Sequence, residues 1–102
     1  MKPNYFPIWL SGFIEAEGCF SIRQNNNHSF SIGQKHDEYL IRIIKNYFKI
    51  ENIIRNPQKD FYLIEVYKKS ILLIIIEHFN NYPLLGEKLN SFNLWKNKFN
   101  SK

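Results

Sequence analysis

The chain has 102 residues, of which 44% are hydrophobic, 23% charged and 17% aromatic, so we expect residues 1–102 to form a single domain with no second one. Fourteen basic against nine acidic side chains leave a net charge of +5, and eleven of the fourteen are lysines, a balance that suits a polyanionic partner such as nucleic acid. The longest aliphatic run, residues 71–76, is far shorter than the ~20 residues that cross a bilayer, which excludes a membrane span.

The first predicted element is a helix over residues 7–17. Pro7 suits the first turn, apolar residues recur at helical spacing, and Gly18 is expected to end the helix in a left-handed conformation. The apolar residues of this helix are Trp9, Leu10, Phe13 and Ile14.

A β-hairpin is predicted next, because apolar and polar residues alternate from Cys19 onward. Its turn is placed at residues 25–28, where three asparagines precede a histidine. One face carries Phe20, Ile22, Phe30 and Ile32, and the other carries Ser21, Arg23, Asn25, Ser29 and Ser31.

A second helix and a second hairpin follow. Asp37 can cap the helix, whose apolar stripe consists of Leu40, Ile43, Ile44, Tyr47 and Phe48. The hairpin is predicted from strands at residues 52–56 and 61–67 around a turn at residues 57–60. We expect its inward side chains to be Tyr62, Ile64 and Val66, and its outward ones to be Leu63 and Glu65.

Two helices complete the predicted chain. Ser70 is expected to cap the first of them, whose residues 71–76 are apolar on every side as in a buried helix, and Pro83 is expected to end it. The last helix directs Leu85, Leu89, Phe92, Trp95 and Phe99 inward, and Lys88, Lys96 and Lys98 toward its exposed rim.

The predicted fold class is therefore α+β, with the element order αββαββαα and one antiparallel four-stranded sheet covered by helices on one face. The other face of the sheet is bare and polar. Such a face suits either contact with solvent or a bound partner.

The acidic end of the first helix is the most informative stretch. Glu15 and Glu17 lie in its last turn, where the helix dipole disfavours each carboxylate by about 0.3–1 kcal/mol. A divalent cation would offset that cost, because a hard metal binds carboxylate and carbonyl oxygens together. Simple exposure of both acids to solvent is the alternative.

Small residues follow one face of the same helix. Gly12 and Ala16 are four residues apart, so two helix backbones could approach closely there and bring two copies of Glu17 together at a two-fold axis. The same spacing could instead seat the helix against its own sheet.

Residues 10–18, Leu-Ser-Gly-Phe-Ile-Glu-Ala-Glu-Gly, resemble the motif of the LAGLIDADG homing endonucleases. Further landmarks resemble those of the family in the same order: the alternating strand after Gly18, the strand that ends at Gln34, the strand with Val66, and the segment 82–88. The resemblance implies a saddle of antiparallel strands in the DNA major groove and, since the chain has one copy of the motif, a homodimer that cuts a long, nearly palindromic site in double-stranded DNA.

The same resemblance implies the roles of single residues. Glu17 is the implied catalytic carboxylate, and Gln34 and Lys88 are the implied water-orienting and charge-stabilising residues. Glu17 of each copy would bind Mg²⁺ or Mn²⁺ together with nearby main-chain carbonyl groups. We assign the carbonyl group of Ala16 as one of these ligands. The residues assigned to the dimer interface are Leu10, Gly12, Glu15 and Ala16.

Polar residues of both hairpins are candidates for DNA contacts. The first hairpin can present donors and acceptors to base edges, and Arg55 and Lys59 of the second can reach phosphates. Glu65, if it faces the DNA, would repel phosphate. The first-hairpin candidates are Ser21, Arg23, Asn25, Asn27, Ser29 and Ser31.

Two other functions stay open at this point. A maturase of the same fold would bind intron RNA through its basic surface without cutting DNA, and a plain α+β interaction domain would bind no nucleic acid. A need for Glu17 and for metal separates the nuclease from the maturase.

The number of cysteines and the codon bias indicate in which cell compartment the protein is expected. Cys19 is the only cysteine, so no intramolecular disulfide forms, and one cysteine with three scattered histidines does not predict a zinc site. The N-terminal region lacks the pattern of a secretory signal, so we expect a soluble intracellular protein. Residues with A/T-rich codons (Phe, Tyr, Met, Ile, Asn and Lys) make up 55 of 102, which suggests an organelle gene, mitochondrial or chloroplast.

Overall fold

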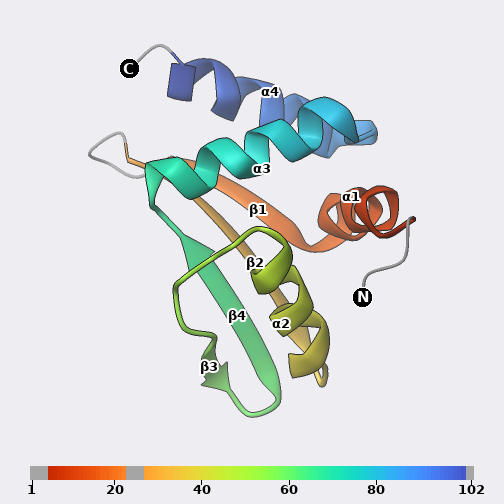
Figure 1. Cartoon of the computed structure of the whole chain (residues 1–102), viewed down its shortest axis with the longest axis vertical. Helices are drawn as coiled ribbons and strands as arrows, with labels where there is room; N and C mark the ends of the chain where they lie inside the picture. The colour runs from red at the N-terminus through yellow and green to blue at the C-terminus, as the bar shows by residue number, and fades with distance from the viewer. Residues whose placement is uncertain (1–4, 23–26, 101–102) are drawn as a thin grey trace.

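A computed structural model describes residues 5–22 and 27–100 of the chain (Figure 1). The predicted order αββαββαα is confirmed. The elements are α1 (Phe6–Glu17), β1 (Gly18–Ile22), β2 (His28–Lys35), α2 (Glu38–Tyr47), β3 (Arg55–Gln58), β4 (Phe61–Val66), α3 (Lys69–Asn81) and α4 (Gly86–Asn100).

The four strands form one antiparallel sheet in the order β1-β2-β4-β3. Period-two alternation places Phe30 and Ile32 of β2, with Ile64 and Val66 of β4, on one face, where all four are buried. Helices α1 and α2 pack on this sheet, and α3 lies beside α4 (Figure 1), where Phe79 contacts Phe92. The predicted inward facing of the second hairpin is therefore confirmed.

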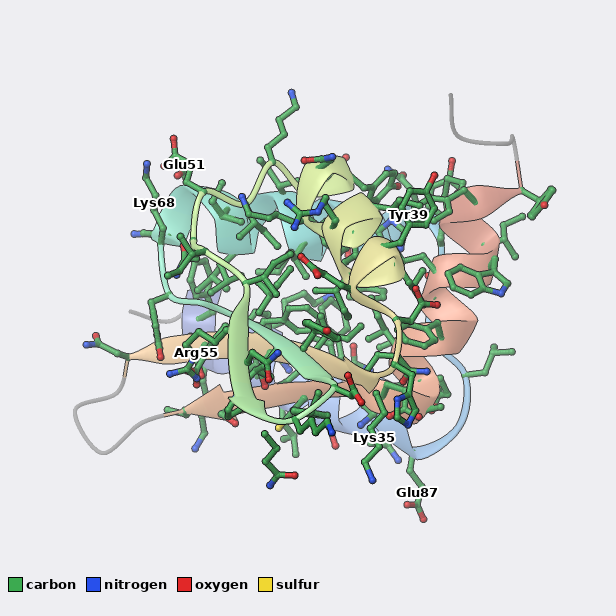
Figure 2. The ribbon with its side chains drawn as sticks, turned by 90° about the horizontal axis from the view of Figure 1, so that it is seen from below. Lys35, Tyr39, Glu51, Arg55, Lys68 and Glu87 are labelled. Carbon is green, nitrogen blue, oxygen red and sulfur yellow. The ribbon has the colours of Figure 1, made fainter. Side chains whose placement is uncertain are left out.

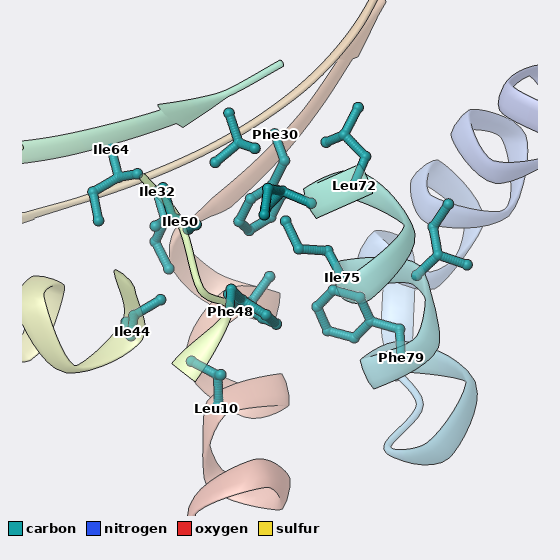
Figure 3. Close-up of a cluster of buried hydrophobic side chains, with 14 of the residues drawn as sticks. Leu10, Phe30, Ile32, Ile44, Phe48, Ile50, Ile64, Leu72, Ile75 and Phe79 are labelled. Atoms are coloured by element: carbon teal, nitrogen blue, oxygen red, sulfur yellow. The ribbon is translucent and has the colours of Figure 1, made fainter. Parts of the chain in front are cut away.

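One hydrophobic core joins the sheet and the helices (Figure 3). Leu10 and Ile14 of α1, Phe48 after α2, and Ile75 of α3 are completely buried against Phe30 and its neighbours. Full burial of a side chain of this size contributes about 1.5–3 kcal/mol. The core therefore fixes α1, and with it the acidic end of that helix, against the sheet.

Helix α2 begins as predicted. The Asp37 carboxylate accepts a hydrogen bond from the main-chain N–H of Leu40 over 3.0 Å, which satisfies one of the unpaired donors at the helix start. Ile41 and Ile44 are buried in the same helix.

Gly18 ends α1 in a different way from the prediction. Its φ of −80° is extended, not left-handed, so conformational freedom does not explain the glycine. Space does, because a Cβ atom at this position would lie 2.5 Å from Cγ2 and 3.1 Å from the carbonyl oxygen of Ile14. The glycine therefore allows β1 to leave α1 directly over Ile14.

Both predicted turns have other limits in the structure. His28 is the first residue of β2 and pairs with Ile22, while residues 25 and 26 lie outside the described residues. In the second hairpin β3 begins only at Arg55 and Pro57 lies inside it, so the turn is residues 59–60. β3 is the edge strand of the sheet, where a proline without an N–H is tolerated.

The C-terminal helices correct three further predictions. Ser70 does not cap α3, because the helix begins at Lys69, two residues earlier than predicted, with Lys68 at the cap and no side-chain cap hydrogen bond. Leu73 of α3 is 48% exposed, so that helix has a solvent side. Leu85 precedes α4 and is 77% exposed, and Leu84 fills the core position instead.

Among the described residues, no helix has the length and apolar character needed to cross a membrane.

Candidate functional site

The end of α1 is joined to the start of α4 by Glu15. Oε1 of its carboxylate accepts the main-chain N–H of Leu85 over 2.8 Å, and Oε2 accepts that of Lys88 over 3.1 Å. The first N–H groups of a helix have no partner within the helix, and its positive dipole end favours an anion. The cost that the sequence predicts for this carboxylate at the end of α1 is thus offset by the start of α4.

Lys88 reaches back to the residue after Glu17. Its Nζ donates to the carbonyl oxygen of Gly18 over 2.6 Å, although the two residues are 70 positions apart in the sequence. Glu17 is exposed at the last position of α1. The ammonium group of Lys88 therefore binds the residue that directly follows Glu17 in the chain.

Gln34 belongs to the same end of the sheet. Gly18 pairs with Ile32, and Gln34 lies two residues farther along β2, opposite Tyr62. Two strand residues span about 7 Å, so the register places this half-buried glutamine one pleat beyond the start of β1. Glu17 and the contact of Lys88 thus lie at the junction of α1 and β1, and the register places Gln34 near that junction.

The donor atoms at this junction are hard oxygens. Glu17 supplies a carboxylate, and the carbonyl of Ala16 is among the last four of α1, which lack a partner within the helix. Within residues 5–22 and 27–100, no group of three or more His, Cys, Asp or Glu side chains could hold a metal ion. The donors fit Mg²⁺ in kind, but one chain alone offers too few carboxylates to enclose it.

The uncovered face of the sheet carries a polar row. Cys19 of β1 pairs with Ser31 of β2, which pairs in turn with Glu65 of β4, so this row crosses three strands. Ser21 and Ser29 pair with each other in the next row. Ser21 is exposed and Ser31 half-buried, but Ser29 is only 3% exposed, which contradicts its predicted contact with DNA.

Arg55 and Glu65 form an ion pair on this face. Nη2 of Arg55 lies 2.9 Å from Oε1 of Glu65, beside a shallow pocket of about 180 Å³. The arginine therefore neutralises the carboxylate whose repulsion of phosphate the sequence predicts. Lys59 is exposed in the turn after β3, and Asn27 is exposed before β2, whereas Arg23 and Asn25 lie outside the described residues.

The small-residue face of α1 points outward. Gly12 and Ala16 are both exposed, and a Cβ atom added at Gly12 would meet nothing within 4 Å. Ile8 continues this face and is 67% exposed. The alternative in which Gly12 and Ala16 seat the helix against its own sheet is therefore wrong.

Leu10 was assigned to the same interface, and the structure contradicts this. Its side chain is 0% exposed because it packs in the chain's own core, so it cannot reach a partner. Glu15 is half-buried, and both of its oxygens accept hydrogen bonds within the chain.

A buried polar network behind α1 was not predicted. His78 of α3 is 5% exposed; its Nε2 lies 3.0 Å from Oγ of Ser11 and its Nδ1 lies 2.8 Å from the hydroxyl of Tyr47. Ser11 also donates to the carbonyl oxygen of Tyr82 over 2.6 Å. The sequence signal was Ser11, a polar residue on the buried side of α1, but its partners are 67 and 71 residues away.

Comparisons with known proteins give one consistent result. A family model described as LAGLIDADG endonuclease matches residues 10–99. The "Probable intron-encoded endonuclease aI3" of Dictyostelium citrinum is 55% identical over 96 residues, covering 94% of this chain and 40% of that protein. The protein of the same name from Debaryomyces hansenii is 58% identical over 88 residues, covering 86% of this chain and 13% of its own length.

Solved structures agree with the sequence relatives. The LAGLIDADG meganuclease I-CpaMI, solved bound to uncleaved DNA, superposes with a TM-score of 0.82 at 30% identity, covering 92% of this chain and 37% of that one. The chain thus spans less than half the length of these three proteins.

Proposed function

This chain belongs to the LAGLIDADG endonuclease family, and we propose that it is a site-specific DNA endonuclease. Two copies would bind a long, nearly palindromic site and cut both strands with the help of Mg²⁺ or Mn²⁺. The observation that supports this proposal best is the contact of the Lys88 ammonium group with the carbonyl oxygen of Gly18, the residue that follows Glu17.

Phosphodiester hydrolysis needs an activated water and neutralisation of the charge that grows on the phosphoryl oxygens. A bound divalent ion supplies charge neutralisation and acidifies a water molecule. Glu17 and the carbonyl of Ala16 would hold that ion, with Glu17 of the second copy and phosphate oxygens completing its shell. Gln34 would orient water molecules at the same corner.

Lys88 would stabilise the transition state directly. A lysine ammonium has three N–H donors, so the bond to Gly18 leaves two for a phosphate oxygen. Donors that are already in place cost no reorganisation when charge develops on the phosphate. The contact with Gly18 therefore supports a catalytic role for Lys88 as well as a structural one.

DNA would lie against the uncovered face of the sheet. Ser21 and Ser31, which lie on that face, would meet base edges, and Lys59 in the turn after β3 would meet a phosphate. The net charge of +5 doubles when two copies pair, which favours binding to a polyanion. Intron RNA is a second candidate partner of the same surface.

The proposal is tested by cleavage selection from a randomised double-stranded DNA library. We expect cut molecules only with Mg²⁺ or Mn²⁺, and we expect their sequences to share a nearly palindromic consensus. Parallel incubation with Ca²⁺ gives the sequences that are bound without being cut. A protein that binds DNA in Ca²⁺ but enriches no cut site in Mg²⁺ would contradict the nuclease.

The outward face of α1 makes the homodimer testable. Gly12→Leu is expected to turn a dimer into a monomer and to remove double-strand cleavage, because the added side chain blocks close approach of two helices. The fold should tolerate it, since a Cβ at Gly12 has open space around it and leucine is a better helix former than glycine. Light scattering after size-exclusion chromatography measures the mass.

Asn93→Leu places the same leucine side chain at an exposed position of α4 and serves as the control for an added apolar surface, which should stay dimeric. A monomeric wild-type protein that still cuts both strands, or a Gly12→Leu variant that stays dimeric, would contradict the proposed contact.

The relatives are intron-encoded by name, and residues with A/T-rich codons dominate this chain. Both observations support a gene in a mitochondrion or chloroplast.

A further inference from the structure

We propose that Glu15 is a positioning residue for cleavage, which fixes Lys88 beside Glu17 by binding the start of α4. This inference rests on the proposed nuclease function. It gives the first acidic residue of the α1 end a role separate from metal binding and from contact with a second copy.

The carboxylate of Glu15 holds α4 at two points. Oε1 binds the N–H of Leu85 and Oε2 binds that of Lys88, over 2.8 and 3.1 Å. Two bonds from one rigid carboxylate fix both the place and the direction of the first turn of α4. A single acceptor would leave that turn free to pivot.

The chain between the two donors is shaped around the carboxylate. Gly86 has a φ of +66°, a left-handed conformation that favours glycine, and a Cβ atom there would lie 3.3 Å from Oε2 of Glu15. The glycine therefore allows the backbone to turn closely over the carboxylate and to direct both N–H groups at it.

Lys88 is consequently anchored at both of its ends to the same short segment. Its main-chain N–H is bound by Glu15, and its Nζ is bound to the carbonyl oxygen of Gly18. Glu17 lies between these two anchors in the sequence. Both ends of Lys88 are therefore bound to the segment that carries Glu17. We expect small movements of α4 to leave the distance between the Lys88 ammonium group and the Glu17 carboxylate nearly unchanged.

The test is the rate of a single turnover on the selected DNA site in Mg²⁺, together with affinity for the same site in Ca²⁺. Glu15→Gln keeps the size of the side chain but replaces one acceptor oxygen by a donor, which faces the N–H of Leu85 or Lys88. We expect cleavage to slow by about 10- to 100-fold, the effect of misplacing a catalytic group by about 1 Å. DNA affinity in Ca²⁺ should stay within about twofold.

Glu87→Gln is the matched control. Glu87 lies next to Lys88 in the first turn of α4 and is exposed, and its side chain extends away from the molecule in Figure 2. The variant removes one negative charge from the turn that Glu15 binds, without touching the bonds to Glu15. We expect wild-type cleavage, so a loss in Glu15→Gln alone would not be an effect of net charge.

A double-mutant cycle separates positioning from folding. If Glu15 acts through Lys88, then Glu15→Gln should slow cleavage by less than about twofold in a Lys88→Met background. Glu15→Asp keeps both acceptor oxygens on a shorter side chain and should give an intermediate rate. Thermal unfolding of each variant shows that the rates refer to folded protein.

The inference is overturned if Glu15→Gln cuts at the wild-type rate, if it slows cleavage equally with and without Lys88, or if its slower rate follows only from unfolding at the assay temperature. In each case a wild-type protein that cuts DNA, and is slowed by Lys88→Met, leaves the proposed function intact. A wild-type protein that cuts no DNA rejects the proposed function itself.

Discussion

Glu17→Gln is expected to abolish DNA cleavage while leaving DNA affinity in Ca²⁺ within about threefold of wild type. The amide has nearly the same size as the carboxylate and sits at an exposed helix end, so the fold should not change. It carries no charge to hold a divalent ion, and metal assistance is worth several kcal/mol in phosphoryl transfer. We therefore expect the cleavage rate to fall by at least about 10³-fold.

The measurement compares single-turnover cleavage with binding on one selected DNA site. Glu77→Gln removes a carboxylate from an exposed position of α3 and is the matched control, which should cut at the wild-type rate. Wild-type cleavage by Glu17→Gln would refute the assignment of the catalytic carboxylate. Retained splicing assistance by a Glu17→Gln protein that cuts no DNA would point to the maturase instead.

The order of elements could be predicted from the sequence because periodicity is a local signal. Alternation around Phe30 and Ile64 and the stripe of α2 each identify one face of one element. It is harder to predict which side chains point inward at the ends of elements. Leu84 and Leu85 are equally apolar, and only the path of the chain after Pro83 decides which of them is buried.

The sequence predicts the residues of the candidate site that lie in the motif, but not the contacts that join them to distant parts of the chain. The family motif identifies Glu17, and the predicted outward face of α1 agrees with the exposure of Gly12 and Ala16. The bonds that join Glu15 and Gly18 of the motif to Leu85 and Lys88 link residues 70 or more positions apart. No local pattern encodes such contacts, since they depend on how α4 returns to α1.

The buried histidine gives a second large effect, on stability. Ser11 donates its proton to the carbonyl of Tyr82, so its oxygen accepts from Nε2–H of His78, and the hydroxyl of Tyr47 then donates to Nδ1. Burial, with Tyr82 nearby, raises the pKa of Tyr47, which keeps its proton available for this bond. The neutral imidazole is therefore fully hydrogen-bonded, and a second ring proton has no acceptor in this arrangement.

Acidification from pH 7 to pH 4 is expected to destabilise the protein through His78. Burial lowers the pKa of this histidine from 6.5 to about 4, so between these values the unfolded chain binds a proton that the folded chain does not. Stability from this group is fully present above pH 6.5 and falls as the pH drops toward 4. The gap between the two pKa values corresponds to about 3 kcal/mol.

Urea unfolding at pH 7, 5.5 and 4 measures the free energy of unfolding of the wild-type protein and of two variants. His78→Gln removes the titration, so its stability should be lower at pH 7 but should fall by about 3 kcal/mol less than that of wild type by pH 4. His36→Gln removes a histidine whose side chain is 74% exposed. Its pair with Asp60 is open to solvent, which makes such a pair worth little, so this variant should lose stability nearly in parallel with wild type. Because the acidic side chains are the same in wild type and His78→Gln, their contribution cancels in that comparison. Parallel pH curves for wild type and His78→Gln would show that the folded protein protonates this imidazole as readily as the unfolded chain does, and that the assigned hydrogen bonds are wrong.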